Sequence, residues 1–79
     1  MKNSYNPQER RVLRRFGERL RTLRQARGLT QENLAEASEM NRNYLSDVER
    51  GTRNISILNL HLLARAFGMP MRELFPEDL

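Results

Sequence analysis

The sequence predicts an all-α fold, with five helices in a single domain spanning residues 1–79. Apolar residues make up 38% of the chain, and they recur at spacings of three and four. Capping residues precede the apolar segments, and Gly follows several of them. No segment alternates Val, Ile or Thr with polar residues, so no strand is expected.

The first helix is expected over residues 7–27, after a flexible tail of residues 1–6. Asn6 is a helix-capping residue, the proline that follows suits the first helical position, and Glu9 occupies the acidic position of a capping box. Gly28 suits a left-handed cap at the other end. The expected apolar face consists of Leu13, Phe16, Leu20 and Leu23.

Two short helices joined by a turn are expected next, over residues 31–38 and 42–50. Thr30 caps the first of them and Asn41 caps the second, and Gly51 closes the pair. The expected inward-facing residues are Leu34, Ala35, Ala37, Leu45 and Val48.

A fourth helix is expected over residues 57–67, capped by Ser56. A short fifth helix is expected over residues 71–75, between Pro70, which opens it, and Pro76, which stops it. The expected core face of the fourth helix consists of Leu60, Leu63, Ala64 and Phe67.

The composition argues against an enzyme. The chain has no Cys, and its single His, His61, falls outside the expected core face. We therefore expect neither a thiolate zinc site nor a Ser-His-Asp triad, and neither a cofactor nor a small-molecule ligand. No apolar run approaches the ~20 residues that cross a bilayer. We expect a cytoplasmic protein without a membrane partner.

Positive charge is concentrated in the first part of the chain. The net charge is +4, but residues 1–30 carry nine cations against two acids. Thirteen of the fourteen cations are Arg, whose planar fork matches phosphate and guanine. This favours a polyanionic partner, although a solvated helix face would look similar. A membrane-surface helix over residues 7–27 is the weaker alternative, because its apolar side is needed for the core.

The helix over residues 42–50 carries an unusual polar face. Leu45 and Val48 are expected to anchor it from behind, and Ala35 is small where the two short helices approach. A major groove is ~12 Å wide and admits one α-helix. Amide, hydroxyl and guanidinium groups on the outward face could then hydrogen-bond base edges. The outward set is Arg42, Asn43, Ser46 and Asp47.

From Thr30 to Phe75 the chain resembles the phage-repressor type of helix-turn-helix protein, the XRE or Cro/repressor family. The likeness extends back to about Gly17. The matching residues are Thr30-Gln31, Leu34-Ala35, Tyr44-Leu45, Val48-Glu49-Arg50-Gly51, Leu63-Ala64, Phe67-Gly68 and Glu73-Leu74-Phe75. Within this family, the run RNYLSDVERGTRN resembles restriction–modification controller proteins, which are small dimeric regulators of their own operon and of the endonuclease gene.

The resemblance implies base contacts from the third helix. Arg42 is expected to bind a guanine edge in a bidentate manner. Asn43 is expected to contact adenine or phosphate, and Ser46 a base or the backbone. Asp47 would accept from cytosine or orient Arg42. Tyr44 would reach the backbone or a thymine methyl, or would have a packing role.

Phosphate contacts are implied at both ends of the helix-turn-helix. Gln31 lies at a helix N-terminus, where backbone N–H groups favour an anion. Arg53 and Asn54 resemble a second phosphate clamp, and Arg50 is either another clamp or a solvated cap. The family pattern also pairs Glu49 with an Arg of the first helix, here Arg24.

Residues 57–79 are expected to form a homodimer interface. Apolar side chains there would be exposed on so small a protein unless they were covered, although they could instead complete the monomer core. A two-fold dimer would place two recognition helices ~34 Å apart, to match a palindromic DNA operator. RNA polymerase is a further possible partner. The expected interface residues are Leu58, Leu62, Met69, Met71, Phe75 and Leu79.

Glu39 departs from the family pattern, which usually has Gly at the turn. If this residue adopts positive φ, its side chain costs roughly 1 kcal/mol.

An antitoxin that binds a toxin protein and regulates its own operon is the main alternative function. A long toxin-wrapping segment would favour it, and none is evident.

Overall fold

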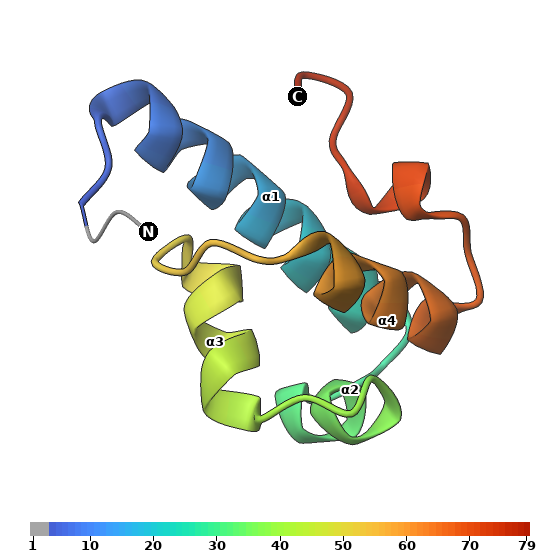
Figure 1. Ribbon diagram of the computed structural model, residues 1–79. Helices are drawn as coiled ribbons and strands as arrows, with labels where there is room; N and C mark the ends of the chain where they lie inside the picture. Colours follow the sequence, from blue (N-terminus) through green and yellow to red (C-terminus); the bar gives the residue numbers. More distant parts are fainter. Residues whose placement is uncertain (1–3) are drawn as a thin grey trace.

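The computed structural model describes residues 4–79 and contains four α-helices and one 3-10 helix (Figure 1). No strand occurs in that range, and the first three residues of the predicted tail lie outside it. The elements are α1 (Pro7–Ala26), α2 (Gln31–Ala37), α3 (Arg42–Arg50), α4 (Ile57–Phe67) and η1 (Met71–Leu74). The all-α prediction is confirmed.

The long helix α1 supports the other elements. It packs against α3 and η1, while α2 packs against α3 and α4 (Figure 1). Every element contributes one Leu that is completely buried. Since these five side chains belong to one core cluster, no helix is packed independently. They are Leu20, Leu34, Leu45, Leu63 and Leu74.

Local capping explains the ends of the helices. The Asn6 side chain and the Glu9 side chain form a capping box at the start of α1. The Asn41 side chain accepts hydrogen bonds from the backbone N–H groups of the second and third residues of α3. Gly51 ends that helix with a φ of 77°, which glycine adopts without steric cost. The predicted bounds of α3 and α4 are confirmed.

The predicted fifth α-helix is wrong. The segment after Pro70 is a single 3-10 turn, in which the Glu73 N–H donates to the Pro70 carbonyl at 3.0 Å. Only five residues separate Pro70 from Pro76, too few for a stable α-helix with i→i+4 hydrogen bonds. The predicted core was also too wide, because Ala37 is exposed and Leu13 is only half-buried.

The C-terminal segment folds back along α1 (Figure 1). Asp78 accepts two hydrogen bonds from the Arg15 guanidinium, at 2.9 and 3.0 Å. These hydrogen bonds hold the pKa of the Asp78 carboxyl below its ordinary value and raise the pKa of Arg15. The ring of Phe75 lies 5.4 Å from that of Phe16. The segment is therefore held by both ionic and aromatic contacts.

The turn between α2 and α3 contains the expected strained residue. Glu39 has a φ of 60°, the left-handed conformation that is unfavourable for a non-glycine residue. The turn closes through a hydrogen bond from the Met40 N–H to the Ala35 carbonyl, at 2.8 Å. The Glu39 carboxylate lies 3.9 Å from the Arg65 guanidinium, but both side chains are well exposed, so this pair contributes little.

Replacing Glu39 with Gly is therefore expected to increase the free energy of unfolding by about 1 kcal/mol. Thermal unfolding should show a melting temperature about 4–8 °C higher. Glu36→Gly provides the matched control, because Glu36 is equally exposed but lies within α2. That variant should be less stable than the parent, by about 0.5–1 kcal/mol. Equal destabilisation by both changes would contradict the strain argument.

Candidate nucleic-acid interface

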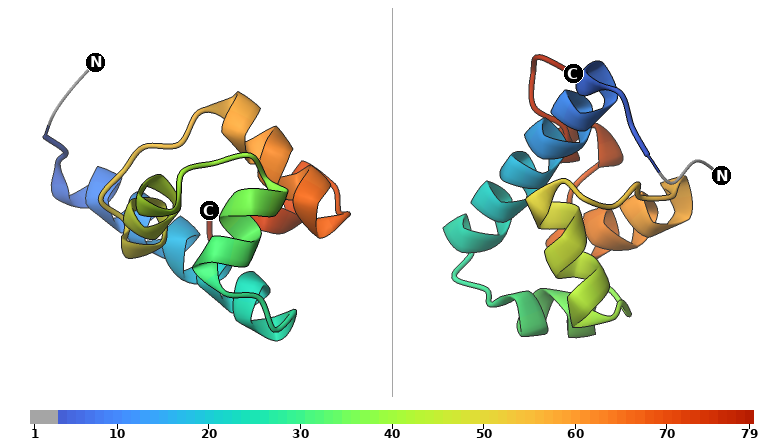
Figure 2. Two further views of the ribbon diagram at one scale, coloured as in Figure 1. Left: turned by 90° about the horizontal axis from the view of Figure 1, so that it is seen from below. Right: turned by 90° about the vertical axis from the view of Figure 1, so that its left-hand side faces the viewer.

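The outward face of α3 is polar and accessible. Leu45 and Val48 are buried behind it, whereas Arg42, Asn43 and Arg50 are exposed. In Figure 1, α3 lies at one side of the molecule, and in the view from that side no other helix is drawn in front of it (Figure 2, right). A helix supported in this way can enter a groove without exposing its core.

Arg42 and its neighbours lie at the N-terminal end of this face. The Arg42 Nε atom is 3.7 Å from the Glu32 carboxylate of α2, and both side chains are at least half exposed. Such an exposed pair is weak, so Arg42 is free to exchange Glu32 for a base. Asn43 is exposed and Ser46 is half-buried. All three therefore lie together on the outward side of α3.

Asp47 has different partners from those predicted. Its carboxylate pairs with Arg50 and lies 3.8 Å from the Arg53 guanidinium. It does not pair with Arg42, so the suggestion that it orients Arg42 is wrong in this structure. Instead, Asp47 forms ion pairs with two of the arginines that were predicted to bind phosphate. A carboxylate held between two guanidiniums leaves this end of α3 with net positive charge.

Tyr44, on α3, is half-buried against the core. Its hydroxyl oxygen accepts a hydrogen bond from the Asn59 side-chain amide at 3.0 Å. The Arg53 guanidinium carbon lies 5.1 Å from the centre of its ring, in cation–π geometry. The packing role is therefore present, and Tyr44 also supports a predicted phosphate-binding residue. Sequence analysis missed Asn59, which no motif marks.

A buried ion pair joins α1 to α3. The Arg24 guanidinium donates to both carboxylate oxygens of Glu49, at 2.7 and 3.1 Å, and both residues are buried. Arg24 also donates to the Leu29 carbonyl at 2.7 Å. The Gln31 side-chain amide donates to the same carboxylate at 3.0 Å. These hydrogen bonds fix the orientation of α3 relative to α1 and to the start of α2.

The ends of the helix-turn-helix carry the remaining predicted phosphate contacts. The Gln31 side-chain amide donates one hydrogen bond to Glu49, so its second N–H and the backbone N–H at the start of α2 are the donors left for a phosphate. Arg50, the last residue of α3, is exposed. In the loop that follows, Arg53 and Asn54 are exposed as well. The Thr52 hydroxyl donates to the Asp47 carbonyl at 3.1 Å and shapes that loop.

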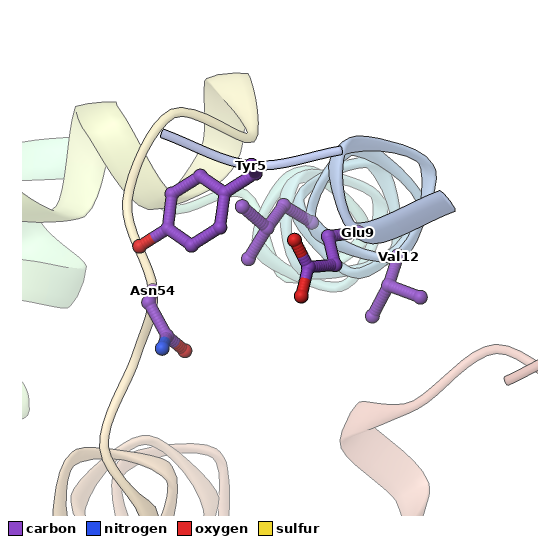
Figure 3. A pocket seen from close by; sticks show the side chains of 5 residues that line it. Tyr5, Glu9, Val12 and Asn54 are labelled. Atoms are coloured by element: carbon purple, nitrogen blue, oxygen red, sulfur yellow. The ribbon is translucent and has the colours of Figure 1, made fainter. Parts of the chain in front are cut away.

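Other features that residues 4–79 could contribute to function are metal sites, membrane-spanning helices and hollows. No group of three His, Cys, Asp or Glu residues there could hold a metal ion, and no helix there is long and apolar enough to cross a membrane. A hollow of about 280 Å³ lies between the start of α1 and the loop before α4 (Figure 3). Its lining residues are Tyr5, Glu9, Val12, Leu13 and Asn54.

A family model described as helix-turn-helix, HTH_3, matches residues 20–74. The chain belongs to the HTH_3 family. The match contains α2, α3, α4 and η1 in full and only the last part of α1. The first turns of α1 therefore precede the family core, although they belong to the same continuous helix.

Several members of the HTH_3 family resemble this chain closely. The crystal structure of the restriction-modification controller protein C.AhdI from Aeromonas hydrophila is 52% identical, covers 80% of this chain and 96% of that chain, and has a TM-score of 0.78. Control protein C.BamHI from Bacillus amyloliquefaciens is 38% identical over 60 residues, 75% of this chain and 74% of the relative. Control protein C.MunI from Mycoplasma sp is 38% identical over 64 residues, which are 80% of this chain and 86% of the relative.

Proposed function

We propose that this protein is a restriction–modification controller, a sequence-specific regulator that binds an operator in double-stranded DNA. The exposed polar face of α3, supported by the buried side chains of Leu45 and Val48, is the observation that carries the proposal. The control proteins among its relatives support the narrower role. Membership in a helix-turn-helix family favours DNA binding over enzymatic activity.

In this proposal, the two functions of the interface are divided along α3. Arg42, Asn43 and Ser46 contact bases at its N-terminal end. Arg50, Arg53 and Asn54 contact phosphates at the other end, and so does the start of α2. Phosphate contacts supply much of the affinity, and base contacts supply the sequence preference.

Selection of bound sequences from a random DNA pool tests the proposed function. The selected sequence should be roughly palindromic and should bind about 10³–10⁷ times more tightly than scrambled DNA at the same salt concentration. Equal affinity for both duplexes would refute sequence-specific regulation. Co-purification with the product of a neighbouring gene would favour the alternative function, an antitoxin that binds a toxin.

Homodimerisation through residues 57–79 is part of the proposal. Of the six predicted interface residues, Leu58 is 73% exposed, and Phe75 and Leu79 are also exposed. Met69 and Met71 are half-buried against the monomer core, and Leu62 is half-buried. Ile57, which was not predicted, is 70% exposed beside Leu58. The start of α4 is therefore the strongest candidate for a surface that needs a partner.

The variant Leu58→Glu is expected to be monomeric at concentrations where the parent chain is dimeric. Its fold should be unchanged, because the Leu58 side chain is largely exposed. Sedimentation measures the mass directly, and operator affinity should fall with the loss of the second half-site contact. Val12→Glu is the matched control, because Val12 is an exposed apolar residue on α1. A dimeric Leu58→Glu protein would exclude this interface.

Contact with RNA polymerase belongs to the same proposal. A regulator that activates transcription from its operator would contact polymerase, whereas one that only occupies the promoter would not need to.

A further inference from the structure

Two arginines of α1, Arg10 and Arg14, lie on the edge of the helix that faces α3. Their spacing of four places them on one side of α1. Gly17 and Arg24 continue along that side, and both contact α3: a Cβ at Gly17 would lie 2.4 Å from the Glu49 carbonyl oxygen, and Arg24 pairs with Glu49. We refer to Arg10 and Arg14 as the α1 arginine pair.

The acids nearest to this pair are already engaged with other groups. Glu9 accepts a hydrogen bond from the Asn6 N–H at 3.0 Å as part of the helix cap. Glu18 lies 2.6 Å from Arg15, which also binds Asp78. Asp78 takes a second cation, Arg11, at 3.5 Å. The carboxylates of Glu18 and Asp78 are therefore paired with Arg11 and Arg15 rather than with Arg10 or Arg14.

The positive charge of the α1 arginine pair is therefore not balanced by a carboxylate of residues 4–79. Within residues 4–79, no acidic side chain lies within ion-pair distance of Arg14. Arg10 donates from Nη1 to the Tyr5 carbonyl at 2.7 Å, a neutral acceptor that orients the guanidinium without cancelling its charge. Both side chains are exposed.

The end of α3 meets α1 at Arg14. A Cβ on Gly51 would lie 2.7 Å from the Arg14 Cα atom, so the two backbones are in direct contact there. Arg50 precedes this glycine and Arg53 follows it closely. Arg14, Arg50 and Arg53 therefore all have their backbones at or near this glycine, and Asp47 is the carboxylate that pairs with the last two.

The loop before α4 continues along the first turns of α1. Asn54 lines the same hollow as Tyr5 and Glu9 (Figure 3). In Figure 1 the loop starts at the end of α3 and runs across α1 toward α4. The predicted phosphate-binding loop therefore lies next to the start of α1, the helix that carries the α1 arginine pair.

We propose that the α1 arginine pair binds DNA phosphates beyond those reached by α3 and its following loop. The inference rests on the proposed function and extends it to the flank of the operator. Charge complementarity and continuity with Arg50, Arg53 and Asn54 identify the ligand as duplex backbone. Both arginines precede residue 20, where the family match begins. These phosphate contacts are therefore additional to those of the helix-turn-helix core.

The length of the duplex provides the test. The full chain is titrated with the selected operator in two forms, one trimmed to the palindrome and one extended by several base pairs on both sides. The parent protein should bind the extended duplex more tightly. The double variant Arg10→Gln/Arg14→Gln should lose that advantage while still preferring operator to scrambled DNA.

The salt dependence gives a second readout. Each lost phosphate contact lowers the slope of log affinity against log salt by about 0.9. The double variant should therefore have a slope shallower by about 3.6 for a dimer that loses two contacts per protomer. The variant Arg11→Gln/Arg72→Gln removes the same charge elsewhere and should keep both the length advantage and the slope.

Two outcomes separate this inference from the proposed function. A double variant that keeps the length advantage and the parent slope would overturn the flank contact, although operator preference would persist. An absence of operator preference in the parent protein would overturn the proposed function itself and the flank contact with it. Thermal unfolding of the double variant should match the parent, because both side chains are on the surface.

Discussion

Replacing Glu49 with Ala is expected to lower the free energy of unfolding by about 3–5 kcal/mol. The change leaves the Arg24 guanidinium buried without its carboxylate, and breaking a buried ion pair from one side costs this much. The Gln31 amide loses its acceptor at the same time. A domain of 79 residues has a total stability of roughly 4–12 kcal/mol. The variant should therefore melt at least about 12 °C below the parent.

The exposed pair of Arg15 and Asp78 supplies the control. It has the same bidentate geometry, at 2.9 and 3.0 Å, but both side chains are partly open to solvent. Asp78→Ala should shift the melting temperature far less than Glu49→Ala, because exposed pairs contribute little. Similar shifts for the two variants would show that burial does not decide the strength of the Glu49 pair.

Replacing Arg42 with Ala is expected to remove most of the preference for operator over scrambled DNA. A bidentate contact between arginine and guanine contributes about 1–3 kcal/mol of discrimination in each half-site, so a dimer loses about 2–6 kcal/mol. The Glu32 contact of Arg42 is weak and exposed, so the fold should be unaffected. Competition binding with the two duplexes measures the ratio directly.

The corresponding Arg53→Ala variant should behave differently. Arg53 lies in the loop after α3 and packs over the Tyr44 ring, where it is expected to bind phosphate. Its loss should weaken binding to operator and to scrambled DNA by similar factors. If Arg42→Ala also weakened both equally, Arg42 would be assigned to the backbone and base recognition would move to Asn43 and Ser46.

The parts of the fold that depend on local chemistry could be predicted from the sequence. Asn41 and Gly51 enclose α3, and Ser56 and Gly68 enclose α4, because a cap acts on its own helix. The 3-10 turn after Pro70 could not be distinguished from a short α-helix by periodicity alone. Leu13 matched the apolar spacing of α1 but is only half-buried.

The side-chain partners at the interface were less predictable, because they depend on how the helices meet. Asp47 binds Arg53 across a loop, and Asn59 reaches Tyr44 from another helix. Neither contact follows from the spacing within one element. The pairing of Arg24 with Glu49 was anticipated only through family resemblance, and the additional hydrogen bond from Gln31 was not.

The five leucines that meet in the core have a consequence for how the protein opens. Since each structural element supplies one of them, detaching any single element would expose apolar surface on the remaining four. Within residues 4–79, none of the five elements can detach while the core persists, so partial unfolding of these elements offers proteases little to cleave. The lifetime of the protein should therefore follow its global stability, and a small loss of stability should reduce its abundance as a whole.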